Sequence, residues 1–134
     1  IRHNLMLMRY YFEDSTSIEM SEDMMQLCAM FGLEKKLDVR PHQLDPEEYR
    51  LFVIVRELSK EPELVLIDRP RAFLRTKNFE TLKRILRHMI RSDVALTFFS
   101  TNRGFAREFS NKRITIDRGK VTTFVSGEKE TQLS

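Results

Sequence analysis

The chain has 134 residues, a formal net charge of +3, 41% apolar residues and 32% charged residues. This composition excludes an intrinsically disordered chain and is typical of one folded domain. No apolar stretch approaches the roughly 20 residues that a membrane-spanning helix needs, no signal-peptide pattern opens the sequence, and a single cysteine, Cys28, excludes an internal disulfide. We therefore expect a cytoplasmic domain with a buried thiol.

The N-terminal part of the chain favours helices. Residues 4–12 are apolar and aromatic, and they fit either a short helix or an extended strip. Ser21 is a suitable N-cap for the acidic turn that follows it, and Gly32 is a typical residue for ending a helix. Between these two residues the sequence predicts a helix, because apolar side chains recur at helical spacing at Met24, Leu27, Cys28 and Phe31.

A second helix starts at the segment 45–48, Asp-Pro-Glu-Glu. This segment places a capping carboxylate, a proline at the first helical position and a glutamate at the third, and we expect the helix to end near Ser59. The run 64–67 then ends at Asp68 and shows no apolar-polar alternation. It predicts a strand that is buried on both faces.

A third helix is predicted from Lys77 to Arg91, with Thr76 as its cap. Residues 94–99 form a second apolar run, which predicts another buried strand. The helix should present one apolar face to the core, made of Phe79, Leu82, Leu86, Met89 and Ile90.

The C-terminal part combines a short helix with a hairpin. Residues 104–109 predict the helix, and the runs 113–117 and 121–125 predict two strands joined by a turn at Arg118 and Gly119. The complete order of elements predicts an α/β fold. Its parallel sheet needs more strands than this chain provides.

Three segments resemble successive landmarks of the ABC transporter-type ATPases. Residues 44–58 resemble the signature motif and its helix, 62–70 the Walker B strand, and 98–106 the switch loop. Residues 4–11 and 31–40 are similar to the family's helical subdomain. The resemblance implies the signature-to-C-terminal portion of a P-loop NTPase-like domain: a partial parallel sheet with flanking helices, a helical subdomain on the N-terminal side and a C-terminal β-hairpin.

The resemblance also implies a division of the chain. Residues 1–44 correspond to a remnant of the helical subdomain, 45–126 to the C-terminal part of the ATPase-like core, and 127–134 to a polar tail. The Walker A loop and the Q-loop would lie upstream of Ile1, which is not a methionine, so we expect a preceding segment. Binding of ATP and Mg²⁺ is expected only together with that segment.

At the signature position this sequence has Leu44, Asp45, Pro46, Glu47 and Glu48. The family presents a serine and free backbone amides to a phosphate there, at a helix N-terminus that favours anions. Here a capping carboxylate would occupy the amides, a proline removes one N–H, and a glutamate adds negative charge. We expect a well-capped helix that repels phosphate.

The other family positions are also replaced. Asp68 keeps the Walker B aspartate and could bind Mg²⁺ or pair with its neighbour, but the position of the catalytic glutamate is Arg69, which cannot act as a base. The aspartate that ends the D-loop corresponds to Arg75, and the switch histidine to Asn102. These replacements predict a degenerate, hydrolysis-deficient domain, in which the family's catalytic groups are absent.

Two functions of different classes remain open. The resemblance implies a structural or regulatory subunit of a transport system, paired with another ABC ATPase-like subunit or a membrane permease at the inner face of the membrane, with 5–31 as the docking surface. The alternative is a nucleic-acid-binding module that uses the basic cluster 69–91. Self-association that covers the incomplete sheet is a third possibility. In the nucleic-acid alternative, the residues that would contact phosphates are Lys83, Arg84, Arg87 and Arg91.

Overall fold

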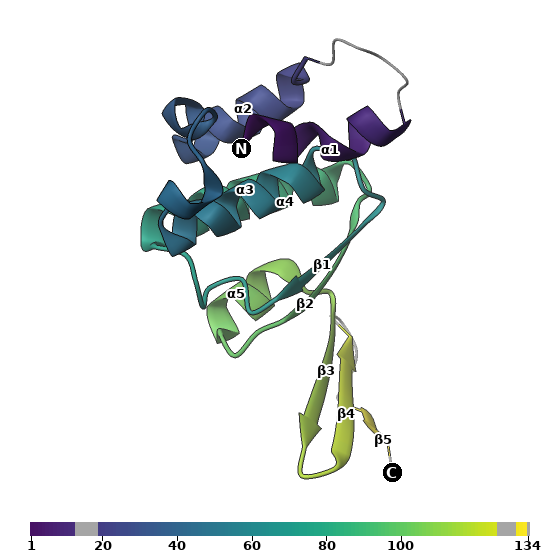
Figure 1. Cartoon of the computed structure of the whole chain (residues 1–134). Coiled ribbons are helices and arrows are strands. Elements are labelled where there is room, and N and C mark those ends of the chain that lie inside the picture. The colour runs from purple at the N-terminus through teal and green to yellow at the C-terminus, as the bar shows by residue number, and fades with distance from the viewer. Residues whose placement is uncertain (13–18, 126–130, 134) are drawn as a thin grey trace. The chain divides into compact units, whose positions relative to one another are not determined.

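The computed structural model describes residues 1–12, 19–125 and 131–133, and the chain forms two compact units, Ile1–Phe98 and Phe99–Ser134. No helix in these ranges is long and apolar enough to cross a bilayer. The first unit contains the helices α1 to α4 and the strands β1 and β2 (Figure 1). Its elements in chain order are α1 (Arg2–Phe12), α2 (Glu22–Phe31), two short 3-10 turns (Glu34–Lys36 and Pro41–Gln43), α3 (Pro46–Leu58), β1 (Leu64–Asp68), α4 (Thr76–Arg91) and β2 (Ala95–Phe99).

The ends of α2 confirm the predicted caps. Ser21 Oγ accepts the backbone N–H of Met24 at 3.3 Å, which satisfies one of the free amides of the first turn. Gly32 ends the helix with φ 71°, a left-handed conformation that glycine adopts at little cost. Residues 4–12 belong to a helix, α1, so the extended alternative is wrong.

The helix α3 begins with the capping box expected from the sequence. Asp45 Oδ1 accepts the backbone N–H of Glu48 at 2.8 Å, and Glu48 Oε2 accepts the backbone N–H of Asp45 at 3.0 Å. The apolar face of α3 is buried in the core through Leu51, Phe52 and Val55. Because α1 and α2 both pack on α3, this helix is the centre of the first unit.

The helix α4 supplies the rest of this core, with two corrections to the predicted helix. It begins at Thr76, so that its N-cap is Arg75 rather than Thr76. Ile90 is 39% exposed because it lies in the last turn, beyond the part of the helix that packs on its neighbours, and Met89 is only partly buried. The buried residues of α4 are Phe79, Thr81, Leu82, Ile85 and Leu86.

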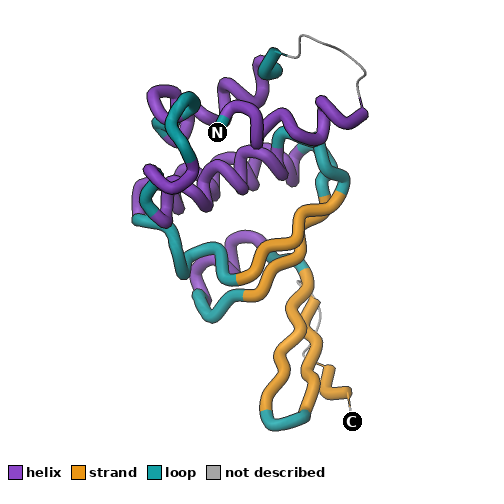
Figure 2. The backbone as a smooth tube through the Cα atoms, in the orientation of Figure 1, coloured by secondary structure: helices purple, strands orange, loops and turns teal. Residues whose placement is uncertain are grey.

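The strands β1 and β2 form a two-stranded parallel sheet with α4 as the connection (Figure 2). The prediction that both faces are buried is wrong for the described residues. Val65 is 7% exposed, whereas Leu66 and Phe99 are each 71% exposed. The side chains of a strand alternate between its two faces, and within the first unit the helices cover only one of them (Figure 1).

The second unit contains α5 (Arg103–Phe109) and a sheet of three antiparallel strands, β3 (Lys112–Asp117), β4 (Lys120–Val125) and β5 (Thr131–Leu133). The predicted hairpin is confirmed: Asp117 pairs with Lys120, and both turn residues, Arg118 and Gly119, have positive φ, as a two-residue hairpin turn requires. The strand β5 pairs with β4 and lies in the predicted tail, of which residues 127–130 and 134 are outside the described residues.

The thiol of Cys28 is fully buried, and burial raises its pKa to about 11. The thiolate is the reactive form, so at pH 8 only about one thiol in a thousand is ionised. We expect alkylation by iodoacetamide to be at least about 100-fold slower in the native protein than in 6 M guanidinium, as followed by mass spectrometry. Comparable rates in the two conditions would contradict the burial of this thiol.

Candidate functional site

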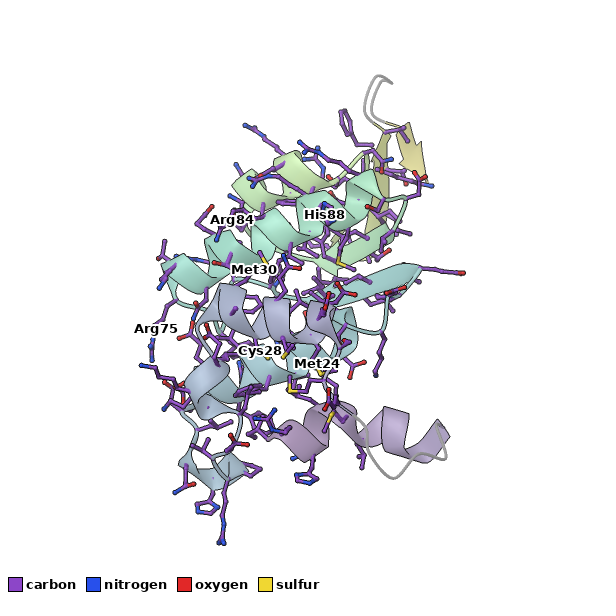
Figure 3. All side chains as sticks on the ribbon, turned by 90° about the horizontal axis from the view of Figure 1, so that it is seen from above. Met24, Cys28, Met30, Arg75, Arg84 and His88 are labelled. Carbon is purple, nitrogen blue, oxygen red and sulfur yellow. The ribbon has the colours of Figure 1, made fainter. Side chains whose placement is uncertain are left out.

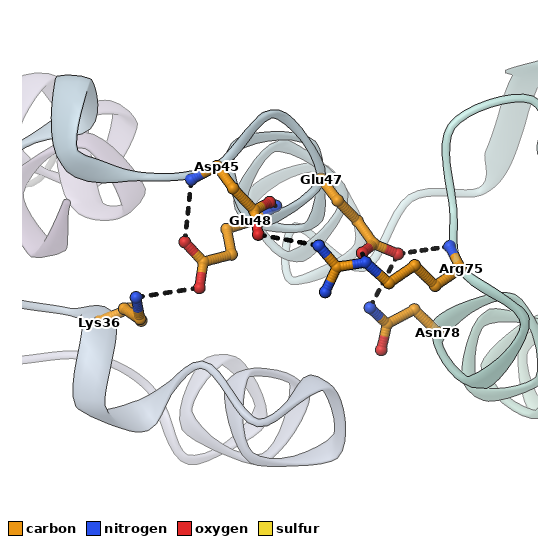
Figure 4. Close-up of polar contacts among 6 residues, drawn as sticks. All are labelled: Lys36, Asp45, Glu47, Glu48, Arg75 and Asn78. Carbon is orange, nitrogen blue, oxygen red and sulfur yellow. Dashed lines mark hydrogen bonds and ion pairs between the residues drawn. The ribbon is translucent and has the colours of Figure 1, made fainter.

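Three carboxylates lie at the start of α3, and each contacts groups from elsewhere in the chain (Figure 4). Glu48 caps the helix with one oxygen, and its Oε1 lies 3.1 Å from Lys36 Nζ. Asp45 caps the helix with Oδ1, and its Oδ2 accepts from Arg75 Nη2 at 3.1 Å. The hydrogen bond from the backbone N–H of Glu48 is the main reason that the pKa of Asp45 is lowered. In the segment that resembles the signature motif, the carboxylates of Asp45 and Glu48 thus bind groups of the same chain.

Glu47 is the most enclosed of these carboxylates, with a side chain that is 9% exposed. Its Oε2 lies 2.9 Å from Arg75 Nε, and its Oε1 accepts the Nδ2 of Asn78 at 3.0 Å. The same Oε1 also accepts the backbone N–H of Arg75. A buried carboxylate needs such partners, since without them it would bear the full cost of desolvation.

These contacts also stabilise the N-terminus of α4. This helix has no acidic residue in its first turn and no side-chain cap of its own. Glu47, from α3, places a negative charge beside the Arg75 N–H and therefore supplies the anion that a helix N-terminus favours. The resemblance places Glu47 where the family has a glycine and Arg75 where it has an aspartate, and in this structure the two side chains bind each other.

A second contact joins α3 to the loop that follows β1. The guanidinium of Arg50 lies over the ring of Phe73, 3.4 Å from its centroid. Arg50 Nη1 is buried and has no hydrogen-bond partner among the described residues, whereas Phe73 is 50% exposed. The aromatic ring shields part of the arginine from water, and a guanidinium over a ring is an attractive arrangement.

At the end of β1, Arg69 Nε lies 3.5 Å from Asp68 Oδ1, and both side chains are exposed, at 62% and 69%. The backbone of Arg69 has φ 45°, so the chain turns sharply after the strand. No group of three or more His, Cys, Asp or Glu side chains in the described part of the chain could hold a metal ion. Mg²⁺ is usually bound through one or two carboxylates together with waters and phosphate oxygens, and the binding of Mg²⁺ by Asp68 stays a prediction.

Asn102, which the resemblance places at the position of the switch histidine, belongs to the second unit. Its Oδ1 accepts the backbone N–H of Phe105 at 2.9 Å, which makes it the N-cap of α5. An asparagine in this position satisfies a free helical amide. The side chain therefore has a structural task in the described structure.

The basic stripe of α4 is only partly available to a ligand. Lys83 is 15% exposed and its Nζ lies 3.1 Å from Glu80 Oε2, while Arg84 Nη2 donates to Thr81 Oγ1 at 3.2 Å. Arg91 is exposed and Arg87 is partly buried. Of the four cations, Arg84 and Arg91 are thus the exposed ones, and Lys83 and Arg84 each have a partner on their own helix.

Figure 3 shows Arg84 and His88 on α4, with Met30 on the neighbouring α2. All three line an open groove of about 730 Å³ whose surface is mainly apolar. The sequence did not predict this groove, because its residues come from separate helices that carry no common motif. It also did not predict the contacts between Glu47 and Arg75, although the opposite charges at these positions were a hint.

The sequence is similar to ABC transporter proteins. No family model matches the sequence. The ATP-binding protein HrtA of Staphylococcus aureus, in strains RF122 / ET3-1 and MRSA252, is 28% identical over 107 residues, which are 80% of this chain and 48% of HrtA. The chain thus spans about half the length of the curated relatives it matches.

The fold is similar to that of solved ABC cassettes. The bacterial ABC transporter cassette MJ0796, solved as a dimer, matches with a TM-score of 0.68 at 21% identity and covers 99% of this chain and 56% of the cassette. An ABC transporter in an inward-facing conformation matches with a TM-score of 0.66 at 18% identity, over 93% of this chain and 52% of the other. The chain is thus similar in sequence to ABC-type ATP-binding proteins and in fold to ABC cassettes.

Proposed function

We propose that the chain is part of a degenerate nucleotide-binding domain of a transport system, deficient in hydrolysis and acting as a structural or regulatory subunit. The support is the combination of a related fold with replaced chemistry. The signature-like segment carries Asp45 and Glu47 instead of phosphate-binding groups, and Arg69 stands where the resemblance places a catalytic glutamate. Such a domain contributes its shape and its contacts to an assembly.

The observation that carries this proposal is the contact between Arg69 and Asp68 at 3.5 Å. A hydrolytic site of the family type needs a metal ion held at the aspartate and a base beside it. A guanidinium is always positively charged, so it competes with a metal ion for the carboxylate and cannot accept a proton. Because both side chains are exposed, the guanidinium competes only weakly with a metal ion. The base that hydrolysis requires is nevertheless missing at this position.

For partners, we propose a second ABC ATPase-like subunit or a membrane permease, at the cytoplasmic face of the membrane. The helical part of the chain offers apolar side chains for this contact. In the described part of the segment 5–31, Leu7 is 58% exposed, Met25 47% and Met30 36%. Methionine side chains adapt to differently shaped surfaces, which suits a docking role. The side chains of residues 8–18 lie outside the described structure.

The nucleic-acid alternative has less support from the geometry. Binding to phosphates needs several free cations on one face, whereas Lys83 is nearly buried and paired with Glu80. The proposed role as part of a nucleotide-binding domain agrees with both the sequence relatives and the fold. Binding to duplex DNA that weakens steeply with salt would reverse this preference.

The proposal is tested in the assembly that contains the protein. We expect Asp68→Asn to leave the ATP turnover of this assembly within about twofold of the unmodified one, because turnover would come from an active partner. The matched control is Asp38→Asn, which removes a carboxylate that pairs with Arg2 instead. A loss of about 100-fold or more in Asp68→Asn, with normal assembly and an unaffected control, would show that this chain carries hydrolytic chemistry.

A further inference from the structure

We infer that Glu47 and Arg75 form a latch that holds the loop 69–75 closed against the start of α3. The inference concerns the conformation of this loop and does not depend on whether the protein hydrolyses ATP. The loop connects β1 to α4, so its position decides which surface the start of α3 can present to a partner.

Several contacts converge on the enclosed carboxylate of Glu47. Glu47 accepts two hydrogen bonds, from the Arg75 backbone N–H and from Asn78, and pairs with the Arg75 guanidinium at 2.9 Å. Two of these three groups belong to the last residue of the loop. Removal of the carboxylate would leave several donors without their acceptor, which costs more than the loss of a single surface contact.

The guanidinium of Arg75 bridges two carboxylates at the start of α3. Its Nε lies 2.9 Å from Glu47 Oε2, and its Nη2 lies 3.1 Å from Asp45 Oδ2 (Figure 4). The planar fork of arginine can bind two carboxylates at once with fixed geometry. The arginine side chain is 73% exposed and Glu47 is 9% exposed, so the buried carboxylate is the stronger half of the latch.

The loop makes three further contacts in this conformation. Phe73 lies under the Arg50 guanidinium, the backbone N–H of Ala72 donates to Arg69 O at 2.9 Å, and Arg71 Nη2 donates to Thr76 Oγ1 at 3.2 Å. Of these, only the contact between Phe73 and Arg50 also joins the loop to α3. The other two fix the turn of the loop itself and its junction with α4. The latch at Arg75 joins this folded loop to α3, which is fixed in the core.

Hydrogen exchange of the backbone amides of residues 71–75 tests the latch in the intact protein. We expect Glu47→Ala to increase the exchange rates of these amides by about tenfold or more, because the closed loop loses its acceptor. The matched control is Glu57→Gln, which removes the charge of another α3 glutamate that pairs with Lys60 at the surface. That control should change the exchange rates of the loop by less than about twofold.

A second variant keeps the test decisive if Glu47→Ala does not fold. Arg75→Ala retains the carboxylate and changes an exposed side chain, and we expect it to raise the exchange rates of the loop by about threefold or more. Arg75→Lys, which keeps the charge but loses the two-carboxylate fork, should fall between Arg75→Ala and the unmodified chain. Unchanged exchange of residues 71–75 in a folded Glu47→Ala or in Arg75→Ala would overturn the inference.

Discussion

We expect Leu82→Ala to lower the free energy of unfolding by about 3 kcal/mol, a large effect for the truncation of one side chain. Leu82 is 1% exposed and lies on the buried face of α4. Truncation of a buried leucine loses the transfer free energy of the removed atoms and leaves a cavity that the rigid core cannot fully close. The measurement is urea denaturation followed by circular dichroism.

Leu7→Ala is the matched control for this experiment. Leu7 also lies in a helix but is 58% exposed, so its truncation should change the free energy of unfolding by less than about 0.5 kcal/mol. Alanine favours helix formation in both variants, so helix propensity does not explain a difference between them. Equal losses in the two variants would contradict the core described for α4.

Helix boundaries and the hairpin could be predicted from the sequence because their causes are local. Ser21 and Asp45 cap helices through groups only three residues away, and the turn at Arg118 and Gly119 needs only the conformational freedom of its own backbone. The start of α4 was misplaced by one residue because the group that serves its N-terminus is not local. It is Glu47, 28 residues earlier in the sequence than the Arg75 N–H that it accepts.

The burial of the strands could not be predicted from their composition. An apolar run without alternation is typical of a strand covered on both faces, and this reasoning failed for Leu66 and Phe99, each 71% exposed. Burial depends on what else packs against a strand, and a run of five residues contains no information on that. The same reason explains why the groove between α2 and α4 was not foreseen.

The candidate site could be predicted in its parts but not in its arrangement. The replacements Asp45, Glu47, Arg69 and Arg75 were identified from their positions, and Asp45 was assigned its capping role correctly. The expectation that Glu47 would act by repelling phosphate considered this residue alone. Its contacts with Arg75 and Asn78 show that the carboxylate is also a structural partner of the following helix. The repulsion of phosphate stays a prediction.

Hydrolysis of ATP by this chain should be absent, which is the largest functional effect that the account predicts. A catalytic base contributes about 10² to 10⁴ in rate, and an electrostatic group at the transition state about 10² to 10³. Arg69 cannot supply the first contribution, and Asp45 and Glu47 oppose the second at the signature-like position. The losses combine, so no turnover above the uncatalysed rate is expected.

The most direct measurement of this central claim is a single-turnover experiment in which the protein is in excess over ATP labelled on its γ-phosphate. We expect phosphate to be released at the same rate with the protein, with its Asp68→Asn variant and with buffer alone. Release that depends on the protein and disappears in a folded Asp68→Asn variant would contradict it, because the reaction would then pass through the end of β1.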